Sequence, residues 1–373
     1  MKILHVLYSG LGGHGNIFFS MVSADAKNEF EYEALFYGIE EVRHEFIEAC
    51  AKNNIPWYFA KKNSKLDLRY YIRILQLIRK SNPDIIFLHG SAYILPAKIA
   101  AFFAKKKTKI IIRETQANHL KTQAQWVSLT GAMLFADKIV CLTAEFKEQI
   151  KKKLGWLYRG EKVTIISNGI NLDVYKPGNR PAGKNIVIGM QSRLVRIKDH
   201  ITLLKAFALL KHEQTGLEFN LTLRIAGDGD FKMELVKFSE EIGLTKDVEF
   251  TGMIPETALV VFLQSLDIYV HASLGETMST AIMQAMACKL PIVASDVNGI
   301  NNMITNRVTG ILVQAQNERE LAAAIQEYLA NINLRQLYAQ NAFDYARTHF
   351  SNQKMMEAYK NIFLSKFLRK TGG

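Results

Sequence analysis

The segment from Ser273 to Ala287 carries the side chains in this sequence that are best suited to chemistry. Glu276 lies at the expected start of a helix, where the helix dipole favours a carboxylate. Taken alone, Glu276 could simply cap that helix. Ser279 and Thr280 follow, and their small side chains leave backbone N–H groups open to an anion. Gln284 lies two helical turns after Glu276 and adds an amide to the same segment.

Two cations and two glycines follow other predicted strands. Arg193 comes just after a strand expected over 185–191, and Lys198 follows five positions later. Cations just past a strand end can hold a diphosphate, although each could also be an ordinary surface charge. Gly227 and Gly252 each end a predicted strand, where glycine lets the backbone approach a ligand closely.

A glycine-rich segment, Gly10 to Gly15, follows the first predicted strand and precedes a helix expected from about Asn16. Its spacing formally matches the G-x-G-x-x-G fingerprint of dinucleotide-binding folds. No acidic residue clearly closes the next strand, so a nicotinamide cofactor has little support. A tight structural turn and a loop for a sugar or a phosphate remain open as alternatives.

Short β-rich runs alternate with helical segments along the whole chain, which predicts parallel, doubly wound sheets of the α/β class. In the first half the predicted strands are 2–8, 31–37, 56–60, 84–89, 108–113, 137–142 and 163–167. In the second half they are 185–191, 220–226, 248–251, 268–272, 291–295 and 311–313. The stretch 177–183 lacks periodicity and predicts an interdomain linker. Residues from about 333 to 368 are helical in pattern, with a break near 350–352.

Size and composition limit the function classes. The chain has 373 residues, of which 49% are hydrophobic and 22% charged, and this excludes a disordered tail, a coiled coil and a small disulfide scaffold. Its three cysteines are far apart and show no metal-ligand spacing, which indicates a reducing compartment. No apolar run is long enough to span a bilayer, and the first residues resemble a strand rather than a signal peptide. We therefore expect a cytoplasmic protein, either soluble or peripheral on a membrane.

The positive charge is concentrated in one region. The net charge is +12, and residues 60–109 hold 12 Lys or Arg against 2 Asp or Glu, a local surplus of +10. The residues Lys65, Arg69, Arg73, Gln76 and Lys80 recur at helical spacing and predict one polar stripe. This stripe could be solvated charge, or it could face an anionic lipid surface or a phosphate-bearing acceptor. A nucleic-acid partner is not expected, because no DNA- or RNA-binding module is visible.

Together these motifs resemble the pattern of glycosyltransferase family 4 on the GT-B fold. The resemblance covers most of the chain and is strongest from about Val163 to Val313. The matching stretches are Ile166 to Asn171, Ser192 to Lys198, Ile225 to Asp228, Phe250 to Gly252, Glu276 to Ala287, Val293 to Gly299 and Thr309 to Val313.

The resemblance implies two Rossmann-like domains that face a central cleft. Residues 1–176 would form the acceptor-side domain and residues 184–352 the nucleotide-sugar donor domain. The final residues, about 353–373, would form a helix that crosses back to the first domain.

The resemblance also implies a retaining transferase that uses a nucleotide sugar and needs no metal or other cofactor. Arg193 and Lys198 would hold the donor diphosphate, and Glu276 would contact hydroxyls of the donor sugar. Gly12 and Gly13 would line the acceptor side of the cleft near the donor phosphates. The remaining expected donor-site residues are Gly227, Gly252, Ser279, Thr280 and Gln284.

Three departures from the family pattern concern the site. The second motif glutamate, which holds the ribose, is Gln284 here, and its amide can still form hydrogen bonds. The usual Pro-Glu after Gly299 is replaced by Asn301 and Asn302. The usual histidine after the fifth strand has only His119 as an approximate counterpart, which makes His119 a candidate for the catalytic acceptor site. His89, at the end of the fourth predicted strand, is a second candidate.

These observations predict transfer of a sugar, from a donor that we expect to be UDP-linked, to a lipid-linked glycan or a lipopolysaccharide-type acceptor at the cytoplasmic face of the membrane. The membrane contact would involve residues 60–109. Two alternatives remain open at this point: a GT-B sugar-nucleotide epimerase or hydrolase, and a basic membrane- or polyanion-binding protein without catalysis.

Overall fold

The computed structural model describes residues 1–10, 13–63, 67–179, 185–213 and 220–365. It divides the chain into two compact units. Unit 1 comprises Met1–Gly169 together with Asn352–Gly373, and unit 2 comprises Ile170–Ser351. Each unit is a parallel sheet covered by helices, so the predicted α/β class with two Rossmann-like domains is confirmed.

Unit 1 contains a parallel sheet of seven strands in the order β3-β2-β1-β4-β5-β6-β7. The strands are β1 (Lys2–Tyr8), β2 (Glu31–Gly38), β3 (Trp57–Lys61), β4 (Ile85–His89), β5 (Lys109–Arg113), β6 (Lys138–Cys141) and β7 (Val163–Ile165). The α-helices are α1 (Gly13–Ala24), α2 (His44–Lys52), α3 (Leu68–Ser81), α4 (Ile94–Phe102), α5 (Gln123–Phe135), α6 (Ala144–Leu154) and α13 (Asn352–Leu364). Short 3-10 turns occupy Ser91–Tyr93, Asn118–Leu120, Gly155–Leu157 and Gly160–Lys162.

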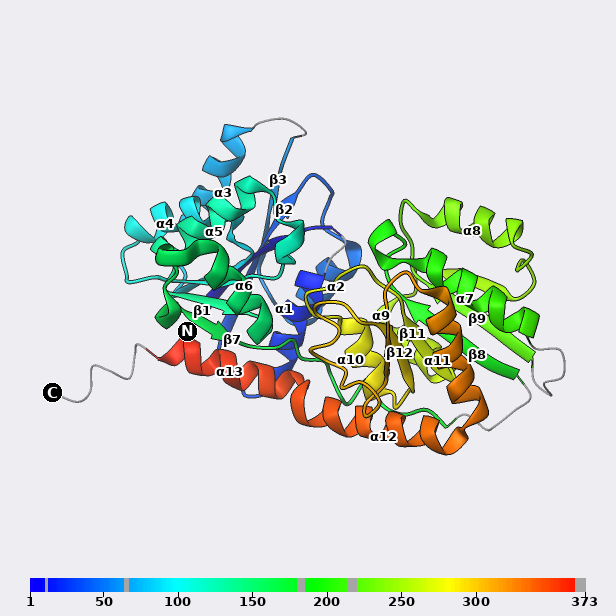
Figure 1. The fold of residues 1–373 in the computed structure, drawn as a ribbon. Coiled ribbons are helices and arrows are strands. Elements are labelled where there is room, and N and C mark those ends of the chain that lie inside the picture. The colour runs from blue at the N-terminus through cyan, green and yellow to red at the C-terminus, as the bar shows by residue number, and fades with distance from the viewer. Residues whose placement is uncertain (11–12, 64–66, 180–184, 214–219, 366–373) are drawn as a thin grey trace. The chain divides into compact units, whose positions relative to one another are not determined.

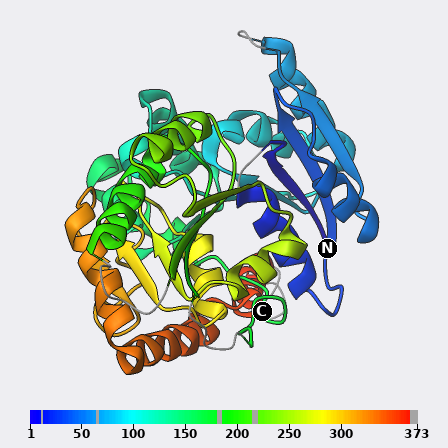
Figure 2. The same cartoon turned by 90° about the vertical axis from the view of Figure 1, so that its right-hand side faces the viewer.

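Helices cover both faces of this sheet, which explains why its strands are mostly apolar. In β1, Leu4 and Val6 belong to the core formed with α3, α4, α5 and α6. Ile3 and Leu7 belong to the opposite core, formed with α1, α2 and α13. The alternation follows from the two-residue period of a strand. Figure 2 shows the first strands of this unit, in blue, with helices packed beside them.

Unit 2 contains a parallel sheet of six strands in the order β10-β9-β8-β11-β12-β13. The strands are β8 (Asn185–Gln191), β9 (Asn220–Ala226), β10 (Val248–Gly252), β11 (Ile268–His271), β12 (Ile292–Ser295) and β13 (Ile311–Val313). The α-helices are α7 (His200–Glu213), α8 (Lys232–Glu241), α9 (Glu256–Gln264), α10 (Thr280–Ala287), α11 (Glu318–Ala330) and α12 (Ile332–His349), and Arg196–Lys198 form a 3-10 turn.

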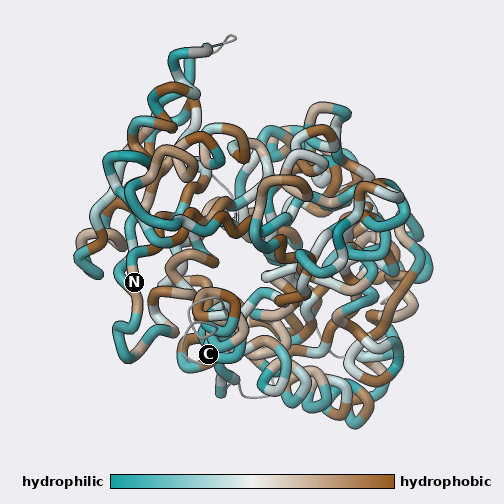
Figure 3. Tube along the Cα trace, turned by 90° about the vertical axis from the view of Figure 1, so that its left-hand side faces the viewer, coloured by the Kyte–Doolittle hydropathy of each residue, from teal (hydrophilic) through white to brown (hydrophobic). Residues whose placement is uncertain are grey.

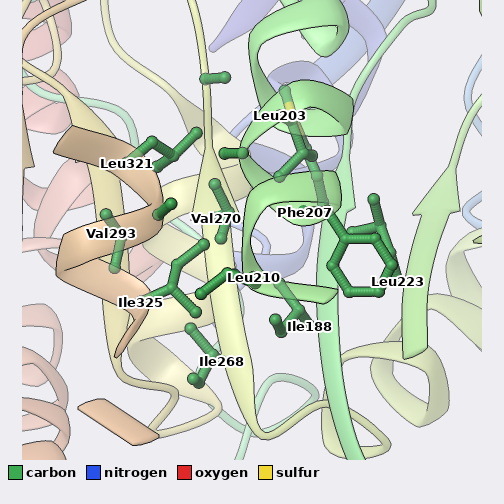
Figure 4. Close-up of a cluster of buried hydrophobic side chains, with 14 of the residues drawn as sticks. Ile188, Leu203, Phe207, Leu210, Leu223, Ile268, Val270, Val293, Leu321 and Ile325 are labelled. Atoms are coloured by element: carbon green, nitrogen blue, oxygen red, sulfur yellow. The ribbon is translucent and has the colours of Figure 1, made fainter. Parts of the chain in front are cut away.

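The core of unit 2 lies between its sheet and the helices α7 and α11. Figure 4 shows Leu203, Phe207 and Leu210 of α7 facing the strands, beside Leu321 and Ile325 of α11. In Figure 3 the tube alternates between teal polar and brown apolar stretches along many of the helices, as expected for elements with one buried side.

The division between the units differs in detail from the predicted boundary at residues 176 and 184. The backbone N–H of Ile170 donates to the carbonyl of Phe350 at 2.8 Å, which ties residues from Ile170 onward to unit 2. The predicted linker begins with residues that pack on unit 2, because Gly178 lies against Gln264. Residues 180–183 of that linker lie outside the described residues.

The helix break predicted near 350–352 is present between α12 and α13. Although α13 is the last helix of the chain, it belongs to unit 1. Met355, Tyr359 and Phe363 are buried there against the strands and α1. The predicted return of the final helix to the first domain is therefore part of the confirmed fold.

Candidate functional site

Three of the predicted donor residues, Arg193, Lys198 and Glu276, follow strands that adjoin the point where the strand order of unit 2 reverses. The neighbouring strands β8 and β11 lead in opposite directions across the sheet, and ligands of doubly wound sheets bind at the carboxyl ends of such strands. Arg193 and Lys198 follow β8, and Glu276 follows β11. The fold thus brings together segments that are 78 positions apart in the sequence.

The centre of this cluster is an ion pair between the Nζ atom of Lys198 and the Oε1 atom of Glu276. Their side chains are nearly buried, with exposed fractions of 14% and 12%. The Nε2 atom of His271, at the end of β11, lies 3.0 Å from the same carboxylate oxygen. Among the described residues, both contacts of the Glu276 carboxylate use Oε1. The second oxygen, Oε2, is therefore suited to accept a hydrogen bond from a ligand hydroxyl.

The ionisation states follow from burial and from the neighbouring charges. Burial opposes ionisation of Glu276, but the His271 hydrogen bond and the Lys198 charge outweigh it and lower the pKa to about 2. Burial lowers the pKa of His271, so its ring is neutral at pH 7 despite the adjacent carboxylate. Because an ionised carboxylate can only accept, Nε2 of His271 carries the proton, and Nδ1 can accept from the Tyr269 hydroxyl 3.2 Å away. His271 thus holds the carboxylate in place without adding a second cation.

Ser279, Thr280 and Gln284 lie on the helix that follows this carboxylate. Ser279 precedes α10 and caps it through its side-chain oxygen, while Thr280 is the first helical residue. The Ser279 hydroxyl is also 3.2 Å from Nε2 of His271. Gln284 is buried, and its Oε1 atom accepts a hydrogen bond of 2.6 Å from Gln191. The helix begins at Thr280, a few residues after the start expected at Glu276, because Ser279 provides the cap.

Arg193 differs from Lys198 in its surroundings. Its side chain is exposed, and within the described part of the chain its guanidinium forms no hydrogen bond or ion pair. The guanidinium is therefore available to an anion near the ends of β8 and β11. The Lys198 ammonium group, in contrast, would have to contact both the Glu276 carboxylate and any bound phosphate.

Gly227 and Gly252 shape the backbone beside the cations. The N–H of Gly227 donates to the carbonyl of Gly252 at 2.8 Å, which joins the loops after β9 and β10. A Cβ atom on Gly227 would lie 1.8 Å from the backbone oxygen of Ser192, and φ at this position is +142°. Gly227 is thus required for the close packing of the segment that carries Arg193. Its role as a direct donor contact remains a prediction.

We expect Gly227→Ala to destabilise unit 2 much more than Gly243→Ala. Gly243 also has a positive φ, +76°, but its Cβ would meet no described atom within 4 Å. The Gly243 variant should cost about 1 kcal/mol, from backbone strain alone. The Gly227 variant should cost roughly 1–3 kcal/mol more, because backbone atoms must move apart. Chemical denaturation of both variants tests this, and equal losses would contradict the proposed close approach.

Unit 1 has its own polar pocket at the equivalent point of its sheet, where the strand order reverses between β1 and β4. The cavity measures about 360 Å³. His14, His89, Ser91, Thr115, Glu114 and Lys121 are among its lining residues. Glu114 and Lys121 form a buried ion pair with an N–O distance of 3.3 Å. This pocket can offer both donors and acceptors to a polyhydroxyl ligand.

Three histidines lie beside this pocket: His5 and His89 are buried, and His14 is half-buried. Nδ1 of His5 lies 3.1 Å from Nε2 of His89, and the rings of His89 and His14 are 5.6 Å apart. Nε2 of His14 lies 3.1 Å from the Thr115 hydroxyl. Burial lowers the pKa of His5 to about 3 and that of His14 to about 4, so both rings are neutral at pH 7. His89, one of the two histidine candidates, lines the pocket.

The other acceptor-side predictions are only partly described. His119 lies in the 3-10 turn Asn118–Leu120, and its side chain is outside the described part of the structure. Gly12 also lies outside the described residues, whereas Gly13 is the exposed first residue of α1. This helix begins earlier than the predicted Asn16. Gly15 packs against the ring of Phe46, so a larger residue would not fit at this position.

The sequence reasoning did not single out His271 or Gln191. Each stands at the carboxyl end of a strand of unit 2 and contacts a predicted site residue. The available signal was a histidine that closes the otherwise apolar strand Ile268–His271. In the described ranges, no three His, Cys, Asp or Glu side chains are grouped to hold a metal. The metal-independent reaction remains a prediction.

Comparison with known families covers almost the whole chain. The pattern of the family described as "Glycosyltransferase Family 4" matches residues 12–174, and that of "Glycosyl transferases group 1" matches residues 173–345. The chain belongs to glycosyltransferase family 4. It is a glycosyltransferase, and the predicted enzyme class is confirmed.

Two relatives are similar to this glycosyltransferase over most of its length. It is 24% identical to the lipopolysaccharide core biosynthesis glycosyltransferase LpsD of Rhizobium meliloti, over 97% of this chain and 98% of the relative. It is 22% identical to the UDP-Gal:alpha-D-GlcNAc-diphosphoundecaprenol alpha-1,3-galactosyltransferase of Escherichia coli, over 82% and 81%. The relatives of this glycosyltransferase thus include lipopolysaccharide and lipid-linked glycan enzymes.

The fold of this glycosyltransferase also matches solved structures. The crystal structure of Anabaena Alr3699/HepE in complex with UDP and glucose superposes with a TM-score of 0.81. The match covers 99% of this chain and 100% of that chain, at 20% identity. This likeness supports the GT-B assignment.

Proposed function

We propose that this glycosyltransferase moves a sugar from a UDP-linked donor to a lipid-linked glycan or a lipopolysaccharide-type acceptor at the cytoplasmic face of the membrane, with retention of configuration. The observation that carries the proposal is the cluster of Lys198, Glu276 and His271 at the switch point of unit 2. In this cluster an ammonium group and a carboxylate lie side by side, which would suit the phosphates and the hydroxyls of a sugar diphosphate.

Cleavage of the anomeric C–O bond leaves negative charge on the departing diphosphate. Arg193 and Lys198 would stabilise this charge, with help from backbone N–H groups at the start of α10. Two cations at the leaving group supply the neutralisation that a metal would otherwise provide, so we propose a metal-independent reaction. The acceptor hydroxyl would attack from the face the diphosphate leaves, and the leaving phosphate would take its proton.

Glu276 and Gln284 would position the two ends of the donor. The carboxylate of Glu276 stays ionised at neutral pH and can accept hydrogen bonds from sugar hydroxyls through Oε2. Gln284 would bind the ribose through its amide, with Gln191 holding the Oε1 atom. Support for a UDP donor comes from the name of the Escherichia coli relative and from the UDP held by Anabaena HepE.

Unit 1 would bind the acceptor at its polar pocket. The Glu114–Lys121 pair and the Ser91 and Thr115 side chains suit a glycan hydroxyl array rather than an apolar ligand. The lipopolysaccharide and diphosphoundecaprenol named for the relatives support an acceptor that is carried on a lipid.

A screen of nucleotide sugars tests the donor half of this proposal. UDP-sugars should raise the thermal unfolding midpoint of the full chain, because a ligand at 100 times its Kd adds about 2.7 kcal/mol to stability. GDP- and ADP-sugars serve as controls for the base. The absence of a shift with every nucleotide sugar, together with unchanged transfer by Glu276→Ala, would contradict the proposal.

A second assay separates transfer from hydrolysis or epimerisation. The enzyme is incubated with radiolabelled donor, with and without membrane lipid extract as a source of acceptor. Label should enter the organic phase only when extract is present. Consumption of donor at the same rate without extract would indicate an epimerase or hydrolase instead.

A further inference from the structure

Helix α4 exposes a continuous apolar stripe. Leu95, Ile99, Phe102 and Phe103 are all solvent-exposed, with the two phenylalanines at 77% and 61%. Their spacing places them on one side of the helix and its C-terminal end. The opposite side of α4 is buried in unit 1 through Ile94, Ala97 and Ala100. We call the four exposed residues the α4 stripe.

Cations surround the α4 stripe. Lys98 is exposed among its residues, and Lys105 and Lys107 are exposed just beyond Phe103. Two other lysines of this run have structural roles, because Lys106 pairs with Asp84 at 2.7 Å and Lys109 donates to the carbonyl of Phe363. The surface charge around the stripe thus comes from a subset of the basic residues in the sequence.

Helix α3 lies beside α4 and adds to this surface. The guanidinium of Arg79 lies 5.8 Å from the centroid of the Phe103 ring, which joins the C-terminal ends of the two helices. The predicted polar stripe of α3 is exposed at Arg69, Arg73, Gln76 and Lys80, while Lys65 lies outside the described residues. A cavity of about 260 Å³ between the two helix ends is lined by Arg79, Phe103 and Lys105.

We propose that the α4 stripe inserts into the interface of an anionic phospholipid bilayer while the surrounding cations contact lipid phosphates. Apolar side chains flanked by Lys and Arg suit this interface, because the apolar parts enter the acyl boundary and the charged heads remain at the phosphates. The exposed cations around the stripe, Arg79, Lys98, Lys105 and Lys107, complement an anionic surface and oppose pairing with a second copy of the same face. The cavity beside Phe103 would be a binding site for one lipid headgroup.

This inference deepens the proposed function, since an enzyme whose acceptor is carried on a lipid must reach the membrane. It can nevertheless fail on its own, because neither the α4 stripe nor its cations belong to the donor cluster.

Vesicle co-sedimentation of the full chain tests the proposal. The wild type should bind vesicles of phosphatidylglycerol and phosphatidylcholine. Its affinity for vesicles of phosphatidylcholine alone should be lower by a factor of at least about ten. The affinity of the double variant Phe102→Ser/Phe103→Ser for the mixed vesicles should be lower than that of the wild type by a factor of at least about ten. Val261→Ser, which alters an apolar side chain of unit 2 that is 66% exposed, should bind like the wild type.

Two further measurements make each outcome decisive. The thermal unfolding midpoint and the UDP-sugar shift of the double variant should match those of the wild type, which separates lost membrane binding from misfolding and from a wrong donor assignment. Unchanged vesicle binding by the double variant would overturn the proposal. A fall in the sedimentation coefficient of the double variant in solution, without lipid, would overturn it in favour of an interface between copies of this chain.

Discussion

Lys198→Ala is expected to lower the rate of sugar transfer about 100- to 1000-fold, as the loss of one preorganised contact to a developing anion typically does. Lys198 is nearly buried and paired with Glu276 at the switch point of unit 2, so its charge acts in a site with little water. The steady-state rate constant and the donor affinity are measured separately. We expect the larger effect on the rate constant, since the charge on the diphosphate grows in the transition state.

Two variants control for loss of structure. Lys211→Ala removes another lysine of unit 2 that pairs with a carboxylate, Asp247 at 2.8 Å, and should leave the rate unchanged. Lys198→Ala leaves the Glu276 carboxylate buried and unpaired, which is itself destabilising. The double variant Lys198→Ala/Glu276→Gln should regain stability but not activity. A double variant that regained the wild-type rate would exclude a role for Lys198 in leaving-group stabilisation.

The second large effect concerns pH. Burial lowers the pKa of His5 to about 3 and that of His200 to about 3, and burial with the Arg113 charge lowers the pKa of His14 to about 4. In the unfolded chain these groups titrate near 6.5. The contribution of these neutral histidines to the free energy of unfolding is therefore fully present above about pH 6.5. It is lost as the pH falls toward their pKa values in the folded protein.

Each such histidine should reduce the free energy of unfolding by about 1.4 kcal/mol per pH unit between pH 6 and pH 4. Chemical denaturation at half-unit steps of pH measures this slope. His5→Leu should remove the contribution of one histidine to this slope, so the free energy of unfolding should change less steeply with pH. This holds whatever the effect of the substitution on stability at pH 7. His44→Leu replaces an exposed histidine and should leave the slope unchanged. An equal slope in the wild type and in His5→Leu would show that His5 is not held neutral by burial.

Much of the fold could be predicted from the sequence because burial on both faces of a parallel sheet leaves a local signature. The apolar strands, the helices between them and the break before α13 were predicted closely. The helix ends were less predictable. The start of α10 depends on a cap by Ser279, and the first residues of α1 are glycines with no helical preference of their own.

The candidate site was predictable only as a set of segments. Parallel strands end at one edge of a sheet, so the sequence by itself determined that Arg193, Lys198 and Glu276 belong near the same edge. Which side chains meet there depends on the order of strands across the sheet, and the sequence pattern does not encode that order. The pairing of Lys198 with Glu276, and the placement of His271 beneath that carboxylate, were decided by the tertiary structure.

The same distinction applies to charge. The sequence alone determined that residues 60–109 carry most of the positive surplus, since composition is independent of the fold. Only the tertiary structure decided that Lys109 is buried against α13 while Lys105 and Lys107 remain exposed beside the apolar stripe of α4. Helical period places a residue on one side of its own helix, but the packing of neighbouring elements determines whether that side faces solvent or the core.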